Sequence, residues 1–258
     1  MVAYLSEVKS SWEPGCTRRT VLYGPHGIGK STWASQWPSP FFVQTEDGLA
    51  HLDVPTWGLC VTLEQAWAQI MELSSEEHGY ETVVVDSVDW LEKLIWDQVC
   101  NDGGKKDIGQ FDYGKGYASA TKKFANLLKS LNGCRDKGMD ILLLAHCEIK
   151  PFRSPDAEQY DRYKPKLHDA ASSLMQEWAD EVLFCNFKIY TRAVDSKFGS
   201  DRSIGIGTGE RVIYTSERPA YSAKNRLGLP DELPMRFDAY EKYLRQCSEA
   251  SNGEKTNG

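Results

Sequence analysis

The sequence predicts an α/β fold in which a mostly parallel sheet is flanked by helices. Short apolar runs of β-type composition recur along the chain, and segments with a helical spacing of apolar residues separate them. The apolar runs are continuous rather than alternating, as in strands that are covered on both faces. Residues 181–217 are strand-like without intervening helices, so we expect a β-rich C-terminal part.

Six strands and six helices are expected, each from a local pattern. The predicted strands cover residues 20–23, 41–44, 59–62, 82–86, 141–145 and 181–187. The predicted helices cover residues 30–37, 63–73, 88–99, 118–131, 172–178 and 236–246. In the third helix, for example, Leu91, Leu94, Ile95 and Val99 recur on one face.

The C-terminal part contains a glycine-rich stretch at residues 204–209. It forms either a hairpin turn or a phosphate-binding loop, and we favour the turn because no helical pattern follows it. Residues 248–258 are polar and rich in Gly, Asn, Lys and Glu, which predicts a disordered tail. We therefore expect one domain over residues 1–247 and a polar tail over residues 248–258.

The composition excludes several protein classes. Of the 258 residues 41% are hydrophobic and 26% charged, as in ordinary globular proteins. No apolar run approaches the roughly 18 residues that cross a bilayer, and the N-terminus lacks a secretory signal pattern. The seven cysteines are scattered without a CxxC pair, which argues against a disulfide framework or a zinc site. We expect a cytoplasmic protein with no membrane partner.

Residues 24–31 read Gly-Pro-His-Gly-Ile-Gly-Lys-Ser, with the G-x4-G-K-S spacing of a phosphate-binding loop. The glycines allow backbone N–H groups to turn inward and form an anion-binding nest at the start of the next helix. Lys30 would reach the β- and γ-phosphates, and the Ser31 hydroxyl would hold Mg²⁺. The residues expected to contact a nucleoside triphosphate are Gly24, Pro25, His26, Gly27, Ile28, Gly29, Lys30, Ser31 and Thr32.

Two acidic residues follow predicted strands at positions that suit nucleotide hydrolysis. The strand 82–86 ends in Asp86, whose carboxylate would hold Mg²⁺ beside the loop, and which is also able to cap the next helix. Glu46 follows the strand 41–44 and would accept a proton from the attacking water. Asp47 is a rival for that role, and a plain Glu-Asp-Gly turn is the alternative.

The order of motifs carries a resemblance to a known family. The loop is followed by Thr-Glu-Asp-Gly at 45–48, Val-Val-Asp-Ser at 84–87, Leu-Leu-Leu-Ala-His at 142–146 and Ala-Lys-Asn-Arg-Leu-Gly at 223–228. This order resembles the RecA-like P-loop NTPase core, and in particular the phage-encoded ATP-binding proteins of the Sak group. Those proteins are AAA-family ATPases linked to single-strand annealing and recombination. The resemblance spans roughly residues 18–246 and implies ATP and Mg²⁺ as cofactors.

The resemblance assigns roles to two residues near the loop. Glu46 corresponds to the glutamate that activates water in eukaryotic and archaeal recombinases, although Asp47 stands where those proteins usually have Gly. His146 corresponds to the polar residue that senses the γ-phosphate and relays its state toward DNA-binding loops, where RecA-type proteins often have Gln. A strand-end histidine satisfied by hydrogen bonds is the alternative for His146.

Lys224 and Arg226 resemble the Lys-Asn-Arg-Phe-Gly motif of bacterial RadA proteins, with Leu227 in place of Phe. In such assemblies basic residues of one subunit reach the γ-phosphate on the next, as an arginine finger does. The resemblance therefore implies a homo-oligomer, a ring or a filament, with ATP at subunit interfaces. A solvated basic turn is the alternative.

In a RecA-like core the DNA-contacting loops follow the fourth and fifth strands. Two long stretches without helix or strand pattern, 101–117 and 148–168, stand there and mix basic with aromatic residues, as single-strand binding requires. The first carries three basic and three acidic residues, the second five and four, and the whole chain −7. The candidate DNA-binding residues are Lys105, Lys106, Lys115, Lys150, Arg153, Arg162, Lys164 and Lys166.

Together these inferences predict a Mg²⁺-dependent, DNA-stimulated ATPase that oligomerises on single-stranded DNA. It would support phage homologous recombination or strand annealing in the host bacterial cytoplasm, with a single-strand DNA-binding protein as the partner that family analogy suggests. The alternatives are a replicative helicase-type motor or helicase loader, and a non-catalytic ATP-gated binding module. A small-molecule kinase is a further alternative, which would need an arginine-rich lid.

Overall fold

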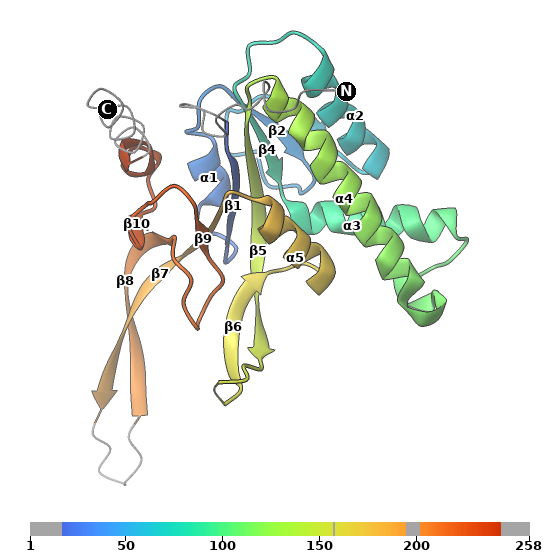
Figure 1. Cartoon of the computed structure of the whole chain (residues 1–258). Helices are drawn as coiled ribbons and strands as arrows, with labels where there is room; N and C mark the ends of the chain where they lie inside the picture. Colours follow the sequence, from blue (N-terminus) through green and yellow to red (C-terminus); the bar gives the residue numbers. More distant parts are fainter. Residues whose placement is uncertain (1–16, 157, 195–201, 244–258) are drawn as a thin grey trace, which may run out of the picture.

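Figure 1 shows the computed structural model of the chain, which describes residues 17–156, 158–194 and 202–243. Within these residues ten strands form one sheet in the order β10-β8-β7-β1-β5-β4-β2-β3, with β6 added to β5 and β9 added to β7. The strands from β7 to β3 in this order are parallel, and β6, β8, β9 and β10 pair antiparallel. The predicted α/β class, with a mostly parallel sheet and a strand-rich C-terminal part, is confirmed.

The elements follow the chain order that the apolar pattern predicts. The strands are β1 (Arg19–Gly24), β2 (Pro40–Gln44), β3 (Thr56–Leu59), β4 (Thr82–Asp86), β5 (Asp140–Phe152), β6 (Tyr160–Pro165), β7 (Glu181–Val194), β8 (Arg202–Tyr214), β9 (Lys224–Asn225) and β10 (Glu232–Pro234). The helices are α1 (Lys30–Ala34), α2 (Leu63–Ser75), α3 (Val88–Asp102), α4 (Lys115–Asp136) and α5 (Asp169–Trp178), with 3-10 turns η2 (Ile108–Gln110) and η3 (Asp112–Gly114). Residues 237–243 are also helical, at the start of the predicted helix 236–246.

The parallel strands are buried because each face of the sheet is covered. Along β1, Val21 and Tyr23 belong to one apolar cluster, which includes side chains of α2, α3, α4 and α5, whereas Leu22 belongs to the other. The second cluster contains Trp33 of α1 and Tyr240, whose rings meet edge to face with centroids 5.2 Å apart. Two covered faces explain why the strands appear in the sequence as continuous apolar runs.

The strand predicted at 59–62 is displaced toward the N-terminus, since β3 ends at Leu59. Residues 60–62 instead connect β3 to the start of α2. Thr62 is the N-cap of this helix, and its hydroxyl accepts a hydrogen bond from the backbone N–H of Gln65. The N-cap requirement therefore decides where the strand stops.

The glycine-rich stretch 204–209 is neither a hairpin turn nor a phosphate-binding loop, and the favoured prediction of a turn is wrong. The stretch lies inside β8, where Ile204 pairs with Arg192 and Gly207 pairs with Ile189 of β7. Gly205 and Gly207 lie in the backbone ladder, whereas Gly209, with a φ of 75°, lies where the register between the two strands shifts, at a position that favours glycine.

The stretch 148–168 is not an irregular loop, as its polar composition suggested. Residues 147–152 of β5 pair antiparallel with residues 160–165 of β6 and form a hairpin beyond the sheet. This hairpin lacks an apolar strand pattern because several of its side chains are exposed to solvent. The other stretch, 101–117, contains the short turns η2 and η3, and α4 begins within it at Lys115.

The carboxyl ends of the parallel strands meet at one edge of the sheet, where β1, β2 and β4 end at Gly24, Gln44 and Asp86. β5 and β7 continue past this edge into two hairpins, β5–β6 and β7–β8, which both extend toward the bottom of Figure 1. The phosphate-binding loop therefore opens at an edge that is flanked by two projecting hairpins.

Among the helices of the described segments, none has the length and apolar character that a membrane crossing demands. The predicted tail 248–258 lies outside the described residues, and the single domain over residues 1–247 stays a prediction.

Candidate active site

The strand register brings the predicted site residues together. Gly24, at the end of β1, lies beside His146 on the neighbouring strand β5. On the next strands Gln44 lies beside Asp86, and the backbone N–H of Thr45 donates a 2.8 Å hydrogen bond to the carbonyl of Asp86. Parallel strands end at a common edge, so motifs that are far apart in sequence meet there.

The loop after β1 has the backbone that a phosphate-binding loop needs. Gly27 and Gly29 have φ angles of 71° and 103°, in the left-handed region that favours glycine. The ammonium of Lys30 donates hydrogen bonds to the carbonyls of Gly24 (3.1 Å) and Pro25 (3.0 Å). The Lys30 side chain is therefore buried against its own loop, and its ammonium is held by two loop carbonyls.

A cavity of about 400 Å³ opens over this loop. Its walls are His26, Gly27, Gly29, Lys30, Ser31, Thr32, Glu46, Gly48, His51, Asp86, His146 and Arg211. Six of the nine predicted nucleotide-contacting residues therefore line the cavity. Gly24 and Pro25 contribute carbonyls to Lys30, whereas the side chain of Ile28 is buried in the apolar core.

Ser31 and Asp86 form the candidate metal site. The Ser31 hydroxyl donates a 2.6 Å hydrogen bond to the carboxylate of Asp86. Burial raises the pKa of Asp86; the Ser31 hydrogen bond opposes this rise, Glu46 adds to it, and Lys30 opposes it. One hydroxyl and one carboxylate suit Mg²⁺, which keeps several waters and is shared with the phosphates of a substrate. The residues present therefore fit the ion.

Glu46 lies across the cavity entrance from the loop. Its carboxylate accepts a 3.0 Å hydrogen bond from the hydroxyl of Ser87 and lies 3.7 Å from Nδ1 of His146. The amide of Gln44 donates to the backbone carbonyl of Glu46 at 3.0 Å. These contacts hold a partly exposed carboxylate beside the cavity, where a water molecule can reach it.

The position of His146 is fixed by contacts with Asp89 on α3. The backbone N–H of His146 donates to Asp89 at 3.0 Å, and Nδ1 of its ring lies 3.0 Å from the other carboxylate oxygen. Burial acts to raise the pKa of Asp89, but the hydrogen bonds and charge of His146 outweigh it and lower that pKa. Asp89 therefore fixes the orientation of the imidazole ring, which leaves its other nitrogen for the cavity.

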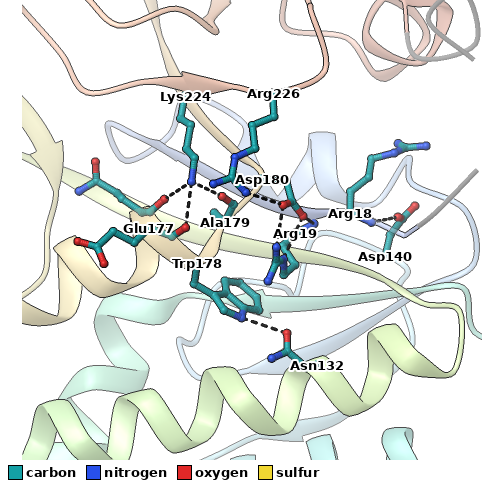
Figure 2. A network of polar contacts seen from close by, with 11 residues as sticks. Arg18, Arg19, Asn132, Asp140, Glu177, Trp178, Ala179, Asp180, Lys224 and Arg226 are labelled. Atoms are coloured by element: carbon teal, nitrogen blue, oxygen red, sulfur yellow. Dashed lines mark hydrogen bonds and ion pairs between the residues drawn. The ribbon is translucent and has the colours of Figure 1, made fainter. Parts of the chain in front are cut away.

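Lys224 lies at the opposite edge of the sheet, where the strands begin. β9 pairs with Glu181 and Val182, the first residues of β7. The Lys224 ammonium donates to the carbonyls that end α5, those of Gln176 (2.9 Å), Glu177 (3.0 Å) and Ala179 (2.5 Å), as Figure 2 shows. Burial and the nearby Arg226 lower the pKa of Lys224. Lys224 thus caps the C-terminus of α5 within its own chain.

Arg226 belongs to the same network of polar contacts but makes fewer of them than Lys224 does. Its guanidinium lies 3.3 Å from the carboxylate of Asp180, which also accepts hydrogen bonds of 3.0 and 2.8 Å from Arg19 (Figure 2). The side chain of Arg226 remains 55% exposed. Its role at a neighbouring subunit stays a prediction, as does that of Lys224.

The candidate DNA-binding residues differ in how exposed their side chains are and in whether they form ion pairs within the chain. Arg162 is buried and ion-paired with Glu217, with a further hydrogen bond to the carbonyl of Tyr221. Lys150 pairs with Glu148 at 2.9 Å. The exposed members are Lys105, Lys106, Lys115, Arg153 and Lys166, and Lys164 is half-buried. Arg162 is thus occupied by contacts within its own chain, and five of the eight candidate DNA-binding residues are exposed.

The sequence-based predictions of site residues do not include Asp89 and Arg211, nor Gly48 and His51 in the cavity wall or Ser87 beside Glu46. Asp89 lies in the first turn of α3, and nothing in the local sequence ties it to His146. Arg211 reaches the cavity from β8, far along the chain, and no motif surrounds it. The Asp89 contact depends on the packing of α3 against β5 and the Arg211 contact on the pairing of β8 with β7, so neither is visible in a local pattern.

Comparison with known protein families matches residues 17–227, most of the chain, to an AAA domain. No curated protein matches the chain. The matched region contains the loop, Glu46, Asp86, His146 and Lys224 to Arg226. The family implies nucleotide binding, usually with Mg²⁺, and points to nucleotide hydrolase activity, in agreement with the cavity over the loop. The chain therefore belongs to the AAA domain family of P-loop ATPases.

Proposed function

We propose that this protein is a Mg²⁺-dependent ATPase that assembles on single-stranded DNA and serves recombination or strand annealing. The observation that carries the ATPase part is the convergence of Lys30, the Ser31–Asp86 pair and Glu46 on one cavity of about 400 Å³. A cation, a metal-binding pair and a candidate base are the parts that phosphoryl transfer to water requires.

Each residue has a distinct part in this reaction. Lys30 would exchange its loop carbonyls for phosphate oxygens and neutralise their charge. Mg²⁺, held through Ser31 and Asp86, supplies further charge neutralisation when it is bound with ATP. Glu46 would orient the attacking water and accept its proton. Ser87 and His146 keep the Glu46 carboxylate in place for that step.

The DNA part rests on continuity between the cavity and the β5–β6 hairpin. His146 lies on β5, and the same strand continues as one arm of the hairpin up to Phe152. At the base of the hairpin His168 stacks on Tyr117 with ring centroids 4.7 Å apart, so the stretches 101–117 and 148–168 meet there. A γ-phosphate that moves His146 would thereby act on both predicted DNA-binding stretches.

Assembly is supported by the place of Arg226. Thr20, which pairs with Glu181 beside β9, is four residues from Gly24, or about 13 Å at about 3.3 Å per residue. Arg226 lies at that far edge, so it is too distant to serve the loop of its own chain. A half-exposed guanidinium in this position suits a neighbouring subunit in a ring or filament.

The resemblance to the phage Sak-group proteins supports the biological setting. We infer a protein that acts in the bacterial cytoplasm during recombination or annealing of phage DNA. A single-strand DNA-binding protein is the expected partner, since it occupies the same substrate.

DNA stimulation tests the DNA part. The ATP turnover rate is measured with Mg²⁺ alone, with a single-stranded oligonucleotide and with duplex DNA. The single strand should raise the rate, and replacement of the exposed Arg153 and Lys166 by Gln should remove the stimulation. Lys129→Gln, an exposed lysine on α4, is the matched control and should respond as the wild type does. If the ATP turnover rate does not change when single-stranded DNA is added, the proposed DNA binding is contradicted and the proposed ATPase activity still stands.

Mixed assemblies test whether Arg226 acts between subunits. Lys30→Ala removes the nucleotide site of its own subunit, and Arg226→Ala removes the contribution to a neighbour. Each variant alone should be inactive, whereas a mixture should regain part of the wild-type turnover. If the mixture stays inactive although both variants assemble, the arrangement in which Arg226 serves a neighbour is wrong.

A further inference from the structure

Arg211 is a cation on the wall of the cavity that none of the roles above uses. It belongs to β8, which is separated from β1 by β7 alone. On β8 it pairs with Phe187 of β7, and its backbone carbonyl accepts a 3.0 Å hydrogen bond from the N–H of Met235. These backbone contacts fix the point from which its side chain reaches toward the loop.

The Arg211 guanidinium lies against the phosphate-binding loop itself. A Cβ atom added to Gly29 would come within 2.9 Å of Nη1 of Arg211. The φ of 103° is what requires glycine at position 29, and the short distance shows how closely the guanidinium approaches the loop. The residue next to Gly29 is Lys30, so two cations stand at one end of the loop.

Within the described residues Arg211 makes no ion pair, and its side chain donates no hydrogen bond. Its closest aromatic neighbour is Phe187, with the guanidinium carbon 6.0 Å from the ring centroid. Arg218 and Arg236, also exposed, pair with Asp231 and Asp238 at 2.7 Å each. A guanidinium has five N–H donors, and those of Arg211 are available to a ligand in the cavity.

Arg211 and the other charged residues of the cavity come from opposite flanks of β1. Glu46, Asp86 and His146 follow or belong to β2, β4 and β5, on one flank of β1. These are the residues suited to act at the γ-phosphate. Arg211 comes from the other flank, beyond β7, so it approaches the loop at Gly29 from the side opposite to these three residues.

We propose that Arg211 is a nucleotide-binding residue that acts within its own chain and binds the phosphate chain on the nucleoside side of the γ-phosphate. This rests on the proposed function, because it assumes that the cavity binds ATP. The guanidinium fork matches phosphate oxygens in geometry and is always charged. Since ATP and ADP share these phosphates, Arg211 contributes to the affinity for both.

Equilibrium titration with fluorescent N-methylanthraniloyl ADP and a non-hydrolysable ATP analogue carrying the same label tests this assignment. Arg211→Gln should weaken both affinities by about 10- to 100-fold, as expected for the loss of charge-assisted hydrogen bonds. Arg211→Lys, which keeps the charge and loses the fork, should fall between Gln and wild type. Arg236→Gln is the matched control and should bind as the wild type does. Thermal melting of Arg211→Gln should be little changed, because within the described residues the side chain makes no ion pair or hydrogen bond and has only a distant contact with the Phe187 ring.

The outcomes separate this inference from the proposed function. If the wild type binds both nucleotides and Arg211→Gln binds them equally well, the role of Arg211 is wrong and the ATPase proposal stands. If only the ATP analogue is bound more weakly, Arg211 acts at the γ-phosphate and the assignment to the nucleoside side is overturned. If the wild type binds neither nucleotide, the proposed function fails and the role of Arg211 fails with it.

Discussion

The two edges of the sheet each hold a lysine and an arginine, but they use them differently. At the carboxyl edge Lys30 and Arg211 line an open cavity, and the Arg211 guanidinium has no ion-pair partner among the described residues. At the amino edge Lys224 donates to three carbonyls at the end of α5, and Arg226 pairs with Asp180. The first pair lines a cavity that a ligand can enter, and Lys30 also donates to two loop carbonyls, whereas Lys224 caps a helix of its own chain.

This difference teaches that a basic motif does not reveal its use through its residue types. The C-terminus of a helix leaves carbonyls without partners, and a lysine that satisfies them stabilises the fold. The Lys224 ammonium has taken that role here, while Arg226 keeps an exposed side chain. We therefore expect substitutions at the carboxyl edge to change nucleotide chemistry and those at Lys224 to change stability.

The largest effect is expected from Glu46→Gln at the carboxyl edge. Loss of the candidate base should lower ATP turnover by about 10²- to 10⁴-fold, with nucleotide affinity little changed, because Gln keeps the shape and loses the proton acceptor. Steady-state turnover and nucleotide titration measure the two quantities. Asp47→Asn, at the exposed neighbour, is the control and should retain turnover. Full activity of Glu46→Gln with loss in Asp47→Asn would transfer the role to Asp47.

Lys30→Ala should weaken nucleotide binding by about 100-fold, because the loop loses the cation that meets the phosphates. The free energy of unfolding in urea should fall by about 1 kcal/mol, less than for Lys224→Met, since two loop carbonyls rather than three lose a donor. Lys129→Ala on α4 serves as the control for charge alone. A large loss of stability with intact binding would show that the two edges do not differ as described.

Lys224→Met should have the reverse profile. The variant keeps an apolar side chain of similar length and removes the donor to three carbonyls, so the free energy of unfolding should fall by about 2 kcal/mol. Nucleotide affinity should be unchanged, because the residue lies at the other edge. Urea unfolding with Lys129→Met as the control measures the effect. If the free energy of unfolding is retained while ATP turnover is lost, Lys224 acts in the reaction, and the proposed difference between the two edges of the sheet is wrong.

A further expected effect depends on pH and concerns Glu92, which links α3 to the base of the hairpin. Its carboxylate accepts the backbone N–H of His168 at 3.1 and 3.0 Å. Burial raises the pKa of Glu92 to about 7. The His168 N–H and Lys150 oppose this shift, whereas Asp89 and Glu148 add to it.

A raised pKa means that the folded protein holds this proton more tightly than the unfolded chain. The stability contributed by protonated Glu92 is complete below pH 4.5, falls as the pH rises and is lost above about 7. Relative to Glu92→Gln, the wild type should lose on the order of 3 kcal/mol of unfolding free energy across this range. Urea titrations from pH 5 to pH 8 measure the difference. A constant difference between the two proteins would contradict the assignment.

The sequence predicts the fold class and the order of elements because those depend on local patterns. The continuous apolar runs of β1 and β4 indicate strands with two covered faces, and the structure buries both. The stretch 148–168 shows the limit, because a hairpin beyond the core has no apolar face to reveal it. Residues 204–209 show the same limit, since their glycines suggest a turn and the pairing partner β7 makes them a strand.

By itself the sequence determined the phosphate-binding loop, with Lys30 and Ser31, and the strand-end Asp86, because each lies in a few contiguous residues whose spacing is the signal. Only the tertiary structure decided that Asp89 orients His146, that Arg211 stands against Gly29, and that Lys224 caps α5. Each of these contacts depends on strand register and helix packing between segments far apart along the chain. A local pattern cannot encode which distant carbonyl or carboxylate a side chain will meet.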